Sequence, residues 1–572
     1  MALRSTAHYF LEGLVELGVE HVFANLGTDH APIIEELARW RQERRRAPRF
    51  VLCPHENVAI HMAGGYALAT GRGQAVLVHV DVGTGNVAAG MHNLQRYRLP
   101  ALVMAGKAPA TSRGELVGAR DSYIHYMQDV RDMPAIVRPY AKWEHSLDAG
   151  VVAKELLRRA QAMMESDPAG PVYLSLPREA LTAQWEEADV ASYPPGKYGP
   201  LKAGGADPDT VAALAERLLA AERPILVTAY AGRYREAPAL VDELAQLAGI
   251  RVFEHNPIHL NIDRTSPCFG GFAPTEALAE ADLGLLVDVD VPWVLKDRRE
   301  NPATFWAQID VDPIKQDIPL WDFPAEQRIQ GSSARVLAQL VAALKARAGE
   351  AQRARSHGRI ESWARSNAAR REAVARAAAE RGAKGALSAA YVCAEVGRAI
   401  GSDAIVLNEA VRNGGVVQDQ VVRTRPGTYV GTGGGGLGFS GGMALGLKLA
   451  QPDRDVVQIL GDGSFYFTTP LAVYAVAKQY ALPIFTVVLD NGGWAAVKAS
   501  TLRVYPDGAA KEAGEYQSML ARGIDLHKVA EACGAHAEAV DDPEALPAAI
   551  GRCLEALRSG RAAVLVARIA AH

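Results

Sequence analysis

Hydrophobic and polar residues follow two alternating patterns along the first third of the chain. Ala7–Leu17 has apolar residues at helical spacing, and the short apolar run Val22–Leu26 that follows is typical of a buried strand. Similar strand-like runs recur, separated by helical segments, at Val51–Pro54, Ala75–Val80, Ala101–Ala105 and Val172–Pro177. Alternation of helices with continuously apolar strands predicts a parallel sheet covered by helices on both faces.

The same alternation returns twice further along the chain. A polar, Pro- and Gly-rich stretch from Tyr193 to Asp209 indicates a linker. Beyond it, strands are expected at Pro224–Thr228, Leu283–Val289 and Ala307–Val311. Residues 351–384 are rich in Ala, Arg and Glu, which favours helix. We therefore predict an α/β protein with three doubly wound parallel-sheet domains, at residues 1–190, 205–345 and 385–572, and a helical connector at 346–384.

Composition narrows the class of protein. The 572 residues suffice for about three to four domains, and 49% hydrophobic with 22% charged residues is ordinary for a globular protein. A net charge of −4 gives no bulk attraction to nucleic acid. No apolar run is long enough for a transmembrane helix, and the N-terminus lacks a signal-peptide core. The five cysteines contain no CxxC pair, which argues against zinc sites and disulfides and is typical of a reducing cytoplasm. Together, charge, hydropathy and cysteine usage predict a cytoplasmic protein that binds neither membrane nor nucleic acid.

Two apolar runs in the last third end in small residues with oxygen-bearing side chains. Val456–Leu460 leads into Gly461-Asp462-Gly463, and Ile484–Leu489 leads into Asp490-Asn491-Gly492-Gly493. The two runs are about one β-α-β crossover apart, so parallel neighbouring strands would bring Asp462 and Asn491 to the same sheet edge. Either residue alone would suit a helix cap or a turn. Together they indicate an oxygen-ligand site for Mg²⁺ holding a diphosphate.

A five-glycine stretch precedes this site. Gly431, Gly433 and Gly436 satisfy the dinucleotide pattern G-x-G-x-x-G, which indicates that the backbone approaches something closely. Leu437, the large residue that follows, could support a flat ring. A nicotinamide dehydrogenase would also need an acidic residue about 20 positions on, closing a strand. Asp453 and Asp455 lie near that distance but in a turn, so this alternative fits poorly.

Three motifs of the first third carry titratable groups at strand ends. Glu56 precedes an Ala/Gly-rich helix and is either a helix N-terminal partner or an acid/base group. His79 and Asp81 are expected on one face of a strand, where His79 is either a core residue or an active-site residue. After the first strand, Gly27-Thr28-Asp29-His30 either caps the next helix or reaches a substrate.

In this order the motifs resemble the thiamine-diphosphate enzymes of the acetolactate synthase, pyruvate decarboxylase and benzoylformate decarboxylase group, along essentially the whole chain. The resemblance implies a pyrimidine-binding, a middle and a diphosphate-binding domain. It implies that Asp462, Asn491 and the Gly493 carbonyl coordinate Mg²⁺, although Asp490 stands where the family usually has asparagine. Glu56 would bond the aminopyrimidine ring, and Leu437 would hold the cofactor bent. The other implied cofactor contacts are Asn86, Asn408, Thr432, Gly433, Gly461, Gly463, Ser464 and Trp494.

The resemblance also implies the chemistry. His79–Asn86 looks closest to benzoylformate decarboxylase, so His79 matches its active-site histidine and Thr28 stands where it has serine. His79, His30 and Asp29 are candidates for proton transfer. The expected reaction is thiamine-diphosphate- and Mg²⁺-dependent cleavage or formation of a C–C bond on a 2-oxo acid, which loses CO₂. Its product is released as an aldehyde or joined to an aldehyde or 2-oxo acid acceptor.

Several alternatives stay open beside that expectation. The segment Arg120–Gln128 looks more like the acetolactate-synthase branch, which would make the chain a carboligase. A lyase acting on an acyloin or a 2-hydroxyacyl-CoA is a further alternative. A scaffold that had lost its chemistry is disfavoured, because Glu56, Asp462 and Asn491 are all present.

The family further implies a homodimer, often a homotetramer, with its active site between chains. Lys498–Gln517 stands where such enzymes carry a mobile lid. Trp293 and Trp494 line the substrate pocket or pack in a core, with core packing slightly favoured. Residues 205–345 carry no counterpart of the flavin signature of anabolic acetolactate synthases, so FAD is not expected.

Overall fold

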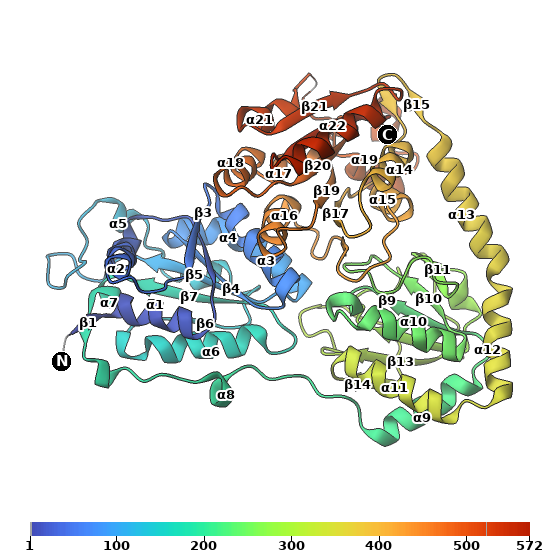
Figure 1. Ribbon diagram of the computed structural model, residues 1–572, viewed down its shortest axis with the longest axis horizontal. Coiled ribbons are helices and arrows are strands. Elements are labelled where there is room, and N and C mark those ends of the chain that lie inside the picture. Colours follow the sequence, from blue (N-terminus) through green and yellow to red (C-terminus); the bar gives the residue numbers. More distant parts are fainter. Residues whose placement is uncertain (1–2, 522, 572) are drawn as a thin grey trace.

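The computed structural model describes residues 3–521 and 523–571, and it contains three parallel six-stranded sheets (Figure 1). The first sheet, in the blue and cyan part of Figure 1, has the order β3-β2-β4-β5-β7-β6. Its strands in chain order are β2 His21–Ala24, β3 Arg49–Leu52, β4 Gln74–Val78, β5 Ala101–Lys107, β6 Glu144–Ser146 and β7 Pro171–Pro177.

Helices cover both faces of this sheet, because successive side chains of a strand point to opposite sides. Phe23 of β2 lies in the hydrophobic cluster of α3 and α4, whereas Val22 and Ala24 lie in the cluster of α1, α2 and α6. The helices are α1 Thr6–Glu16, α2 Ala31–Gln42, α3 Glu56–Thr70, α4 Val80–Tyr97 and α6 Ala153–Glu165, with the shorter α5 Ile124–Met127 and α7 Arg178–Thr182. The predicted doubly wound sheet is therefore confirmed.

The middle sheet has a different order, β11-β10-β9-β12-β13-β14, with the first strand of the domain at its centre. Its strands are β9 Pro224–Thr228, β10 Arg251–Glu254, β11 Phe269–Gly271, β12 Leu283–Val287, β13 Phe305–Asp310 and β14 Gln327–Gln330. Its helices are α9 Pro208–Ala220, α10 Ala237–Ala248 and α11 Ser333–Arg347. The segment before α9 is extended apart from α8, Pro195–Tyr198. Two long helices, α12 Glu350–Ser362 and α13 Ala364–Ala379, then run along the edge of the molecule to the third sheet (Figure 1).

The third sheet has the order β18-β17-β19-β20-β22-β21. Its strands are β17 Ile405–Glu409, β18 Tyr429–Val430, β19 Val456–Gly461, β20 Phe485–Asp490, β21 His536–Val540 and β22 Ala563–Arg568. Its helices are α14 Ala389–Ala399, α15 Gly414–Gln420, α16 Phe439–Ala450, α17 Asp462–Phe467, α18 Pro470–Tyr480, α19 Ala495–Val504, α20 Ala509–Ala513, α21 Leu526–Ala532 and α22 Leu546–Arg558. Two small antiparallel pairs complete the fold. β1 Arg4–Ser5 pairs with β8 Gln184–Trp185 and joins the two ends of the first domain, whereas β15 Gly382–Ala383 and β16 Ala386–Leu387 form a hairpin at the start of the third domain.

The first and third sheets share one topology, since each places its first strand between its second and third. The order of strands therefore reverses at β2/β4 in one domain and at β17/β19 in the other. Ligands of open α/β sheets bind outside the carboxyl ends of the strands at such a reversal. Two candidate crevices follow, one at the ends of β2 and β4 and one at the ends of β17 and β19.

Helices α3 and α16 pack directly on one another and join the first domain to the third. A Cβ atom on Gly65 of α3 would lie 2.1 Å from the Met443 carbonyl oxygen, and one on Gly446 of α16 would lie 2.1 Å from the Met62 carbonyl oxygen. The two backbones can approach so closely only because both positions are glycine. The hydrophobic cluster around this contact is continuous through the two domains.

One detail of the predicted topology is wrong. β4 ends at Val78, His79 is the residue before α4, and Asp81 lies in the first turn of that helix, so His79 and Asp81 do not share a strand face. The chain turns at Val80, whose φ of +31° is unusual for a β-branched residue. This turn, rather than a longer strand, places His79 at the sheet edge.

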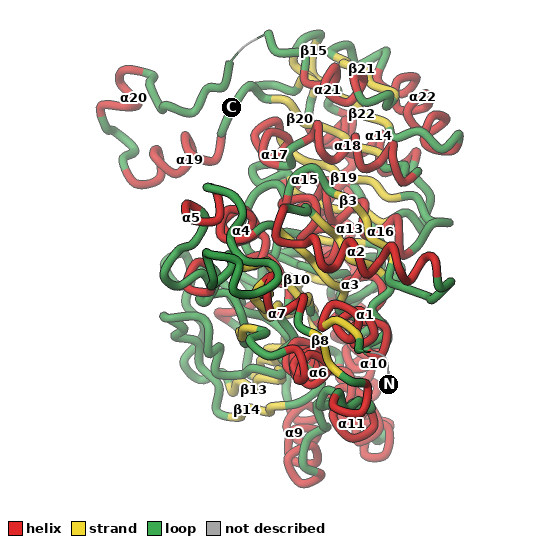
Figure 2. The backbone as a smooth tube through the Cα atoms, turned by 90° about the vertical axis from the view of Figure 1, so that its left-hand side faces the viewer, coloured by secondary structure: helices red, strands yellow, loops and turns green. Residues whose placement is uncertain are grey.

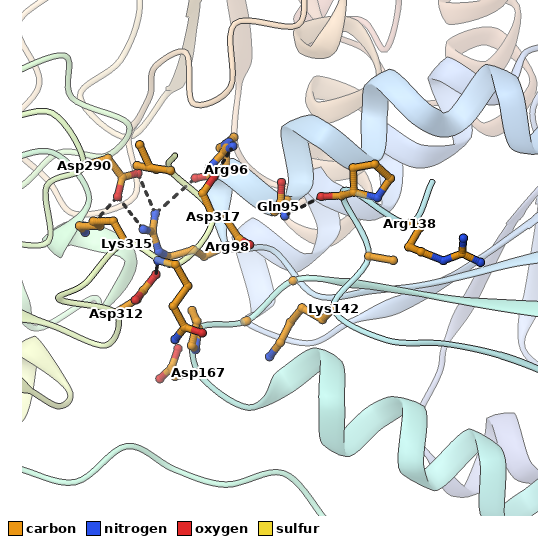
Figure 3. A pocket seen from close by; sticks show the side chains of 17 residues that line it. Gln95, Arg96, Arg98, Arg138, Lys142, Asp167, Asp290, Asp312, Lys315 and Asp317 are labelled. Carbon is orange, nitrogen blue, oxygen red and sulfur yellow. Dashed lines mark hydrogen bonds and ion pairs between the residues drawn. The ribbon is translucent and has the colours of Figure 1, made fainter. Parts of the chain in front are cut away.

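The first and middle domains meet through buried charged groups. Arg98 donates to both carboxylate oxygens of Asp290, at 3.1 and 2.6 Å, and Lys315 lies 3.0 Å from the same carboxylate. Figure 3 shows these side chains converging beside a cavity of about 420 Å³ that Lys142 and Asp167 also line. The contact fixes the middle domain against the C-terminal end of α4. No helix in the described part of the chain is long and apolar enough to cross a membrane.

Candidate active site

The crevice of the first domain contains a histidine–carboxylate pair, in which Asp29 is buried and His79 is partly exposed. Asp29 follows β2, His79 follows β4, and His79 Nδ1 lies 2.5 Å from Asp29 Oδ1. A Cβ on Gly27 would lie 1.9 Å from His79 Nδ1, and one on Gly106 would lie 1.5 Å from Asp29 Oδ2. Both glycines are therefore required by the pair, and the sequence pattern does not reveal either requirement.

The two ring nitrogens of His79 both face oxygen acceptors, because Nε2 lies 3.0 Å from Gln128 Oε1. The hydrogen bond with Asp29 outweighs partial burial and raises the pKa of His79 above its ordinary value. Burial opposes ionisation of Asp29, but its bond with His79 and the charge of His30 keep its pKa below the usual range. Protonation of His79 is therefore favoured beside the Asp29 carboxylate, and Nε2 is the ring nitrogen that lies against the Gln128 side chain.

His30 and Thr28 lie in the same crevice but differ in character. His30 is fully buried, its Nδ1 accepts from the Gly27 amide at 3.0 Å, and burial lowers its pKa. His30 Nε2 lies 3.3 Å from Asp29 Oδ2 and has no hydrogen-bond partner among the described residues. Thr28 Oγ1 lies 3.3 Å from His125 Nε2. The structure thus brings together four of the five predicted catalytic residues, and His30 is the most deeply buried of them, packed against Asp29.

A loop that sequence reasoning could not place covers this crevice. It carries His125 and Gln128, which contact Thr28 and His79 respectively. Arg120 fastens the loop from within by donating to the His125 carbonyl at 2.7 Å, and Arg178 donates to the Gly118 carbonyl at 2.8 Å. In the sequence, Arg120–Gln128 is distinguished only by its resemblance to the acetolactate-synthase branch, because no local pattern shows which of its polar residues point inward.

Glu56 is the first residue of α3 and is 7% exposed. Asn86 donates to its Oε2 at 3.0 Å, and His55, which caps α3 by accepting from the Asn57 amide, lies beside it. Asn57 also donates to the Gly438 and Phe467 carbonyls, at 3.2 and 3.3 Å, so the start of α3 abuts the third domain. Glu56 is a carboxylate held at a domain boundary by one side-chain bond.

The crevice of the third domain is a cavity of about 310 Å³ at the carboxyl ends of β19 and β20. The two strands are adjacent and parallel, with Gly461 opposite Leu489, as the sequence predicted. Asp462 begins α17, and Asn491 Oδ1 accepts from the Gly493 amide at 3.1 Å. The cavity is lined by eight predicted residues, namely Leu437, Gly461, Asp462, Gly463, Ser464, Asn491, Gly493 and Trp494.

The charges of this cavity fit a divalent cation. Burial and then the neighbouring Asp490 carboxylate raise the pKa of Asp462 to about 6, against the opposing backbone hydrogen bonds. A cation would relieve this repulsion, and a carboxylate, an amide oxygen and a carbonyl are suitable ligands for Mg²⁺. The Gly493 carbonyl already accepts a hydrogen bond from the Ala495 amide at 3.1 Å, and its second lone pair is left to bind a cation.

The remaining predicted cofactor residues are engaged within the protein. Asn408 donates to the Gly414 carbonyl at 2.9 Å, Thr432 donates to the Asn408 carbonyl at 3.3 Å, and Ser464 donates to the Glu409 carbonyl at 3.1 Å. Asn408 and Thr432 thus shape the loops around the cavity. Gly433 lies against Tyr97, since a Cβ there would be 2.8 Å from that ring. Helix α4 of the same chain lies against the five-glycine stretch. The glycines are therefore explained by contact with this helix and do not require a bound dinucleotide.

Two other predictions concern aromatic residues and the lid segment. Trp293 is 2% exposed and packs on Trp306 and Phe323, so it belongs to the core of the middle domain. Trp494 is 40% exposed and lines the cavity, so the expectation of core packing is wrong for this residue. Residues 498–517 form parts of α19 and α20, which project from the body of the molecule in Figure 2.

Comparison with known proteins identifies the class that this fold and site define. Residues 4–135 match the model of the N-terminal TPP binding domain of thiamine pyrophosphate enzymes, and residues 414–567 match that of the C-terminal TPP binding domain. The chain therefore belongs to the thiamine pyrophosphate (thiamine diphosphate) enzyme family, in its 2-oxo acid decarboxylase and acetolactate-synthase-like group.

Individual relatives are distant but span the whole chain. Benzoylformate decarboxylase of Pseudomonas aeruginosa is 25% identical over 95% of this chain and 95% of that protein. Acetolactate synthase isozyme 3 large subunit of Escherichia coli is 24% identical over 98% and 94%. A Rhodococcus jostii 4-hydroxybenzoylformate decarboxylase structure, at 22% identity with both chains fully covered, has a TM-score of 0.77. Benzoylformate decarboxylase from Polynucleobacter necessarius, at 19% identity over 99% of both chains, reaches 0.80, and both likenesses concern the fold.

Proposed function

We propose that the protein is a thiamine-diphosphate- and Mg²⁺-dependent decarboxylase that converts a 2-oxo acid into CO₂ and an aldehyde. The observation that carries this proposal is the position of His79, whose Nδ1 lies 2.5 Å from Asp29 Oδ1 while its Nε2 faces away from that carboxylate, 3.0 Å from Gln128 Oε1. Release of an aldehyde requires protonation of the carbon that has lost CO₂, and a positioned acid favours that outcome over attack on a second carbonyl. The 2-oxo acid decarboxylases among the relatives support the same reaction class.

In this proposal Asp462, Asn491 and the Gly493 carbonyl would hold Mg²⁺ beside the diphosphate group. Gly461, Gly463 and Ser464 would border the diphosphate, Leu437 and Trp494 would contact the rings, and Asn408, Thr432 and Gly433 would shape the surrounding loops. When bound, thiamine diphosphate supplies the electron sink on which the bond to the departing carboxylate breaks. No flavin is assigned.

The chain's own residues then perform three tasks. Glu56, oriented by Asn86, shares a proton with a ring nitrogen of the aminopyrimidine. His79 Nε2 delivers a proton to the substrate carbon, and Asp29 stabilises the imidazolium beforehand. Thr28 and His125 hydrogen-bond the substrate carboxylate or carbonyl at the crevice. The loop with Gln128 keeps water from the His79 side of the site.

The experiment incubates the purified protein with thiamine diphosphate, Mg²⁺ and a panel of aliphatic and aromatic 2-oxo acids, with and without an acceptor aldehyde. Mass spectrometry follows the products while CO₂ release is measured separately. We expect an aldehyde in amounts equal to CO₂. The variant Glu56→Gln should fold and bind Mg²⁺ yet lose turnover, and Glu538→Gln, at a half-buried carboxylate of the edge strand β21 that pairs with Arg552 and His536, serves as the control. Near-wild-type turnover by Glu56→Gln would contradict the role of Glu56.

Carboligation is the second candidate, favoured by the near-full-length similarity to acetolactate synthases. It predicts an acyloin or acetolactate in the same assay. If no 2-oxo acid is consumed although the cofactor binds, cleavage of an acyloin or a 2-hydroxyacyl-CoA is to be tested instead.

We also propose that a second copy of the chain completes the site, as a homodimer or homotetramer. The third-domain cavity is lined only by residues 410–497, whereas Glu56 and His79 lie in the first domain. Large apolar side chains around the cavity are exposed, namely Val411, Phe467, Trp494 and Val497. Exposed apolar groups around a binding site indicate a surface that a partner covers.

A further inference from the structure

Helix α4 of the first domain grips the glycine stretch of the third domain through three side chains. Tyr97 donates to the Gly431 carbonyl at 2.5 Å, and His92 Nε2 lies 2.8 Å from the Gly434 oxygen. Asn93 makes the most complete contact, since its Nδ2 donates to the Gly436 carbonyl at 2.9 Å. Its Oδ1 accepts from the Gly436 amide at 3.1 Å. Asn93 therefore satisfies both backbone groups of one residue.

The glycines are present because α4 lies so close. A Cβ on Gly436 would be 2.6 Å from Asn93 Oδ1, and a Cβ on Gly433 would be 2.8 Å from the Tyr97 ring. Neither neighbour can retreat without losing its hydrogen bond to the loop. The stretch is thus shaped to receive the helix.

A buried histidine sets the orientation of the Asn93 amide. His61 Nδ1 lies 2.9 Å from the Asn57 carbonyl, so this nitrogen carries the proton. Its Nε2 then accepts from Asn93 Nδ2 at 3.1 Å. Burial lowers the pKa of His61 to about 4, which keeps the ring neutral. A reversed amide would oppose two acceptors, so only one orientation of Asn93 fits.

On the far side of Leu437 a second buried side chain holds the backbone. Glu409, at the end of β17, is fully buried and accepts from the Gly438 amide at 2.5 Å and the Ser440 amide at 2.9 Å. These amides lie at the start of α16, where the helix dipole also favours a carboxylate. Leu437 therefore stands between two residues whose backbones are fixed by side chains from different domains.

We propose that Asn93 and Glu409 are positioning residues that hold Leu437 from its two sides, so that contact between the first and third domains of one chain sets the shelf on which the cofactor ring rests. The proposal rests on the proposed function for the role of Leu437. The hydrogen bonds of Asn93 to Gly436 and of Glu409 to Gly438 and Ser440, which we call the clamp, do not depend on that function. Neither residue touches the reacting atoms. Their effect is on where Leu437 lies and how rigidly it is kept there.

The test compares Asn93→Ala and Glu409→Gln with Asn367→Ala. Asn367 is a matched control, because it is also buried, and its Nδ2 donates to the Pro267 carbonyl at 2.8 Å across another domain contact. The first readout is amide hydrogen exchange of residues 431–440 in the cofactor-free protein. We expect exchange at Gly436 and Gly438 to quicken about tenfold in the two clamp variants, and to stay unchanged in the control.

The second readout separates positioning from general stability. At saturating thiamine diphosphate and Mg²⁺, the clamp variants should lose about tenfold in kcat with little change in KM for the 2-oxo acid. Asn93→Asp, which keeps the acceptor for the Gly436 amide, should fall between wild type and Asn93→Ala and is informative if the alanine variant does not fold. Unchanged loop exchange in these variants would overturn the clamp. Faster exchange with unchanged kcat would overturn its link to Leu437, while absence of any turnover in wild type would instead count against the proposed function.

Discussion

His79 is flanked by two acceptors, and its protonation state should control the proposed reaction. Its pKa is raised by the bond to Asp29, so the imidazolium is present at low pH and is lost as pH rises through that raised value. In Asp29→Asn the carboxylate is gone and partial burial dominates, which lowers the pKa of His79. We expect kcat to fall about 10²-fold at neutral pH and its alkaline limb to move to lower pH, measured from the pH profile of kcat.

The free energy of unfolding should also decrease as pH rises and His79 loses its proton. A group whose folded pKa is raised contributes fully below its unfolded value, about 6.5, and loses that contribution as pH rises through the folded value. Wild type should therefore lose more stability than Asp29→Asn across this window, measured by denaturant unfolding. An identical alkaline limb in the kcat profiles of both proteins would contradict the pairing of Asp29 with His79.

Asp490 makes a separate prediction about the metal. It adds a second carboxylate beside Asp462, where the family usually has asparagine. Replacing it with asparagine removes the repulsion, so the pKa of Asp462 should fall. Mg²⁺ should then bind several-fold more weakly in the presence of diphosphate, because one negative charge near the cation is lost. Isothermal titration measures this, and tighter Mg²⁺ binding by Asp490→Asn would show that the second charge does not assist the cation.

How far single residues could be predicted depended on whether their partners are local. Asp462 and Asn491 end adjacent strands, so the pattern alone was sufficient to bring them together. Gln128 and Asn93 could not be found this way, because their contacts are with residues far along the chain and each looks like an ordinary polar side chain. Asp81 was placed on a strand wrongly because the positive φ of Val80 has no signature in the sequence.

Helices α3 and α16 illustrate a constraint that belongs to whole elements. Their contact requires Gly65, where an added Cβ would lie 2.1 Å from a backbone oxygen that cannot move independently of α16. We expect Gly65→Ala to destabilise the protein by about 2–3 kcal/mol through overpacking. Gly551→Ala, on the exposed face of helix α22 with no atom within 4 Å of the new Cβ, should stabilise it by about 0.5–1 kcal/mol.

Chemical denaturation of both variants measures the difference, and cofactor affinity should fall in Gly65→Ala alone because α16 begins two residues after Leu437. Equal stability of the two variants would mean that the helices separate at little cost. The strands that the apolar runs predict match the observed strands to within two residues at each end, whereas others, such as β6, β10 and β17, were not predicted. Which glycines serve a helix contact could not be predicted, because a glycine in an alanine-rich helix has no distinguishing pattern.

The arrangement of the three domains gives a prediction about the assembled enzyme. The two crevices lie at equivalent points of the first and third sheets, and the proposed site needs Glu56 from one and Asp462 from the other. If a second copy of the chain completes each site, two inactive variants, Glu56→Gln and Asp462→Ala, should complement each other. A hetero-oligomer purified through two different tags would contain one intact site in every two, and its turnover should be about half that of wild type.

A second hetero-oligomer, with both substitutions on one chain, distinguishes sites shared between two chains from sites built within one chain. A chain carrying both substitutions, assembled with a wild-type chain, leaves no intact site when each site draws on two chains, because every site then includes one altered residue. It leaves half the sites intact when each site draws on one chain. We therefore expect activity in the first hetero-oligomer and none in the second, with sedimentation confirming equal assembly. The opposite result would place Glu56 and Asp462 of one chain in one site, with the contact between α3 and α16 as the boundary across which they act.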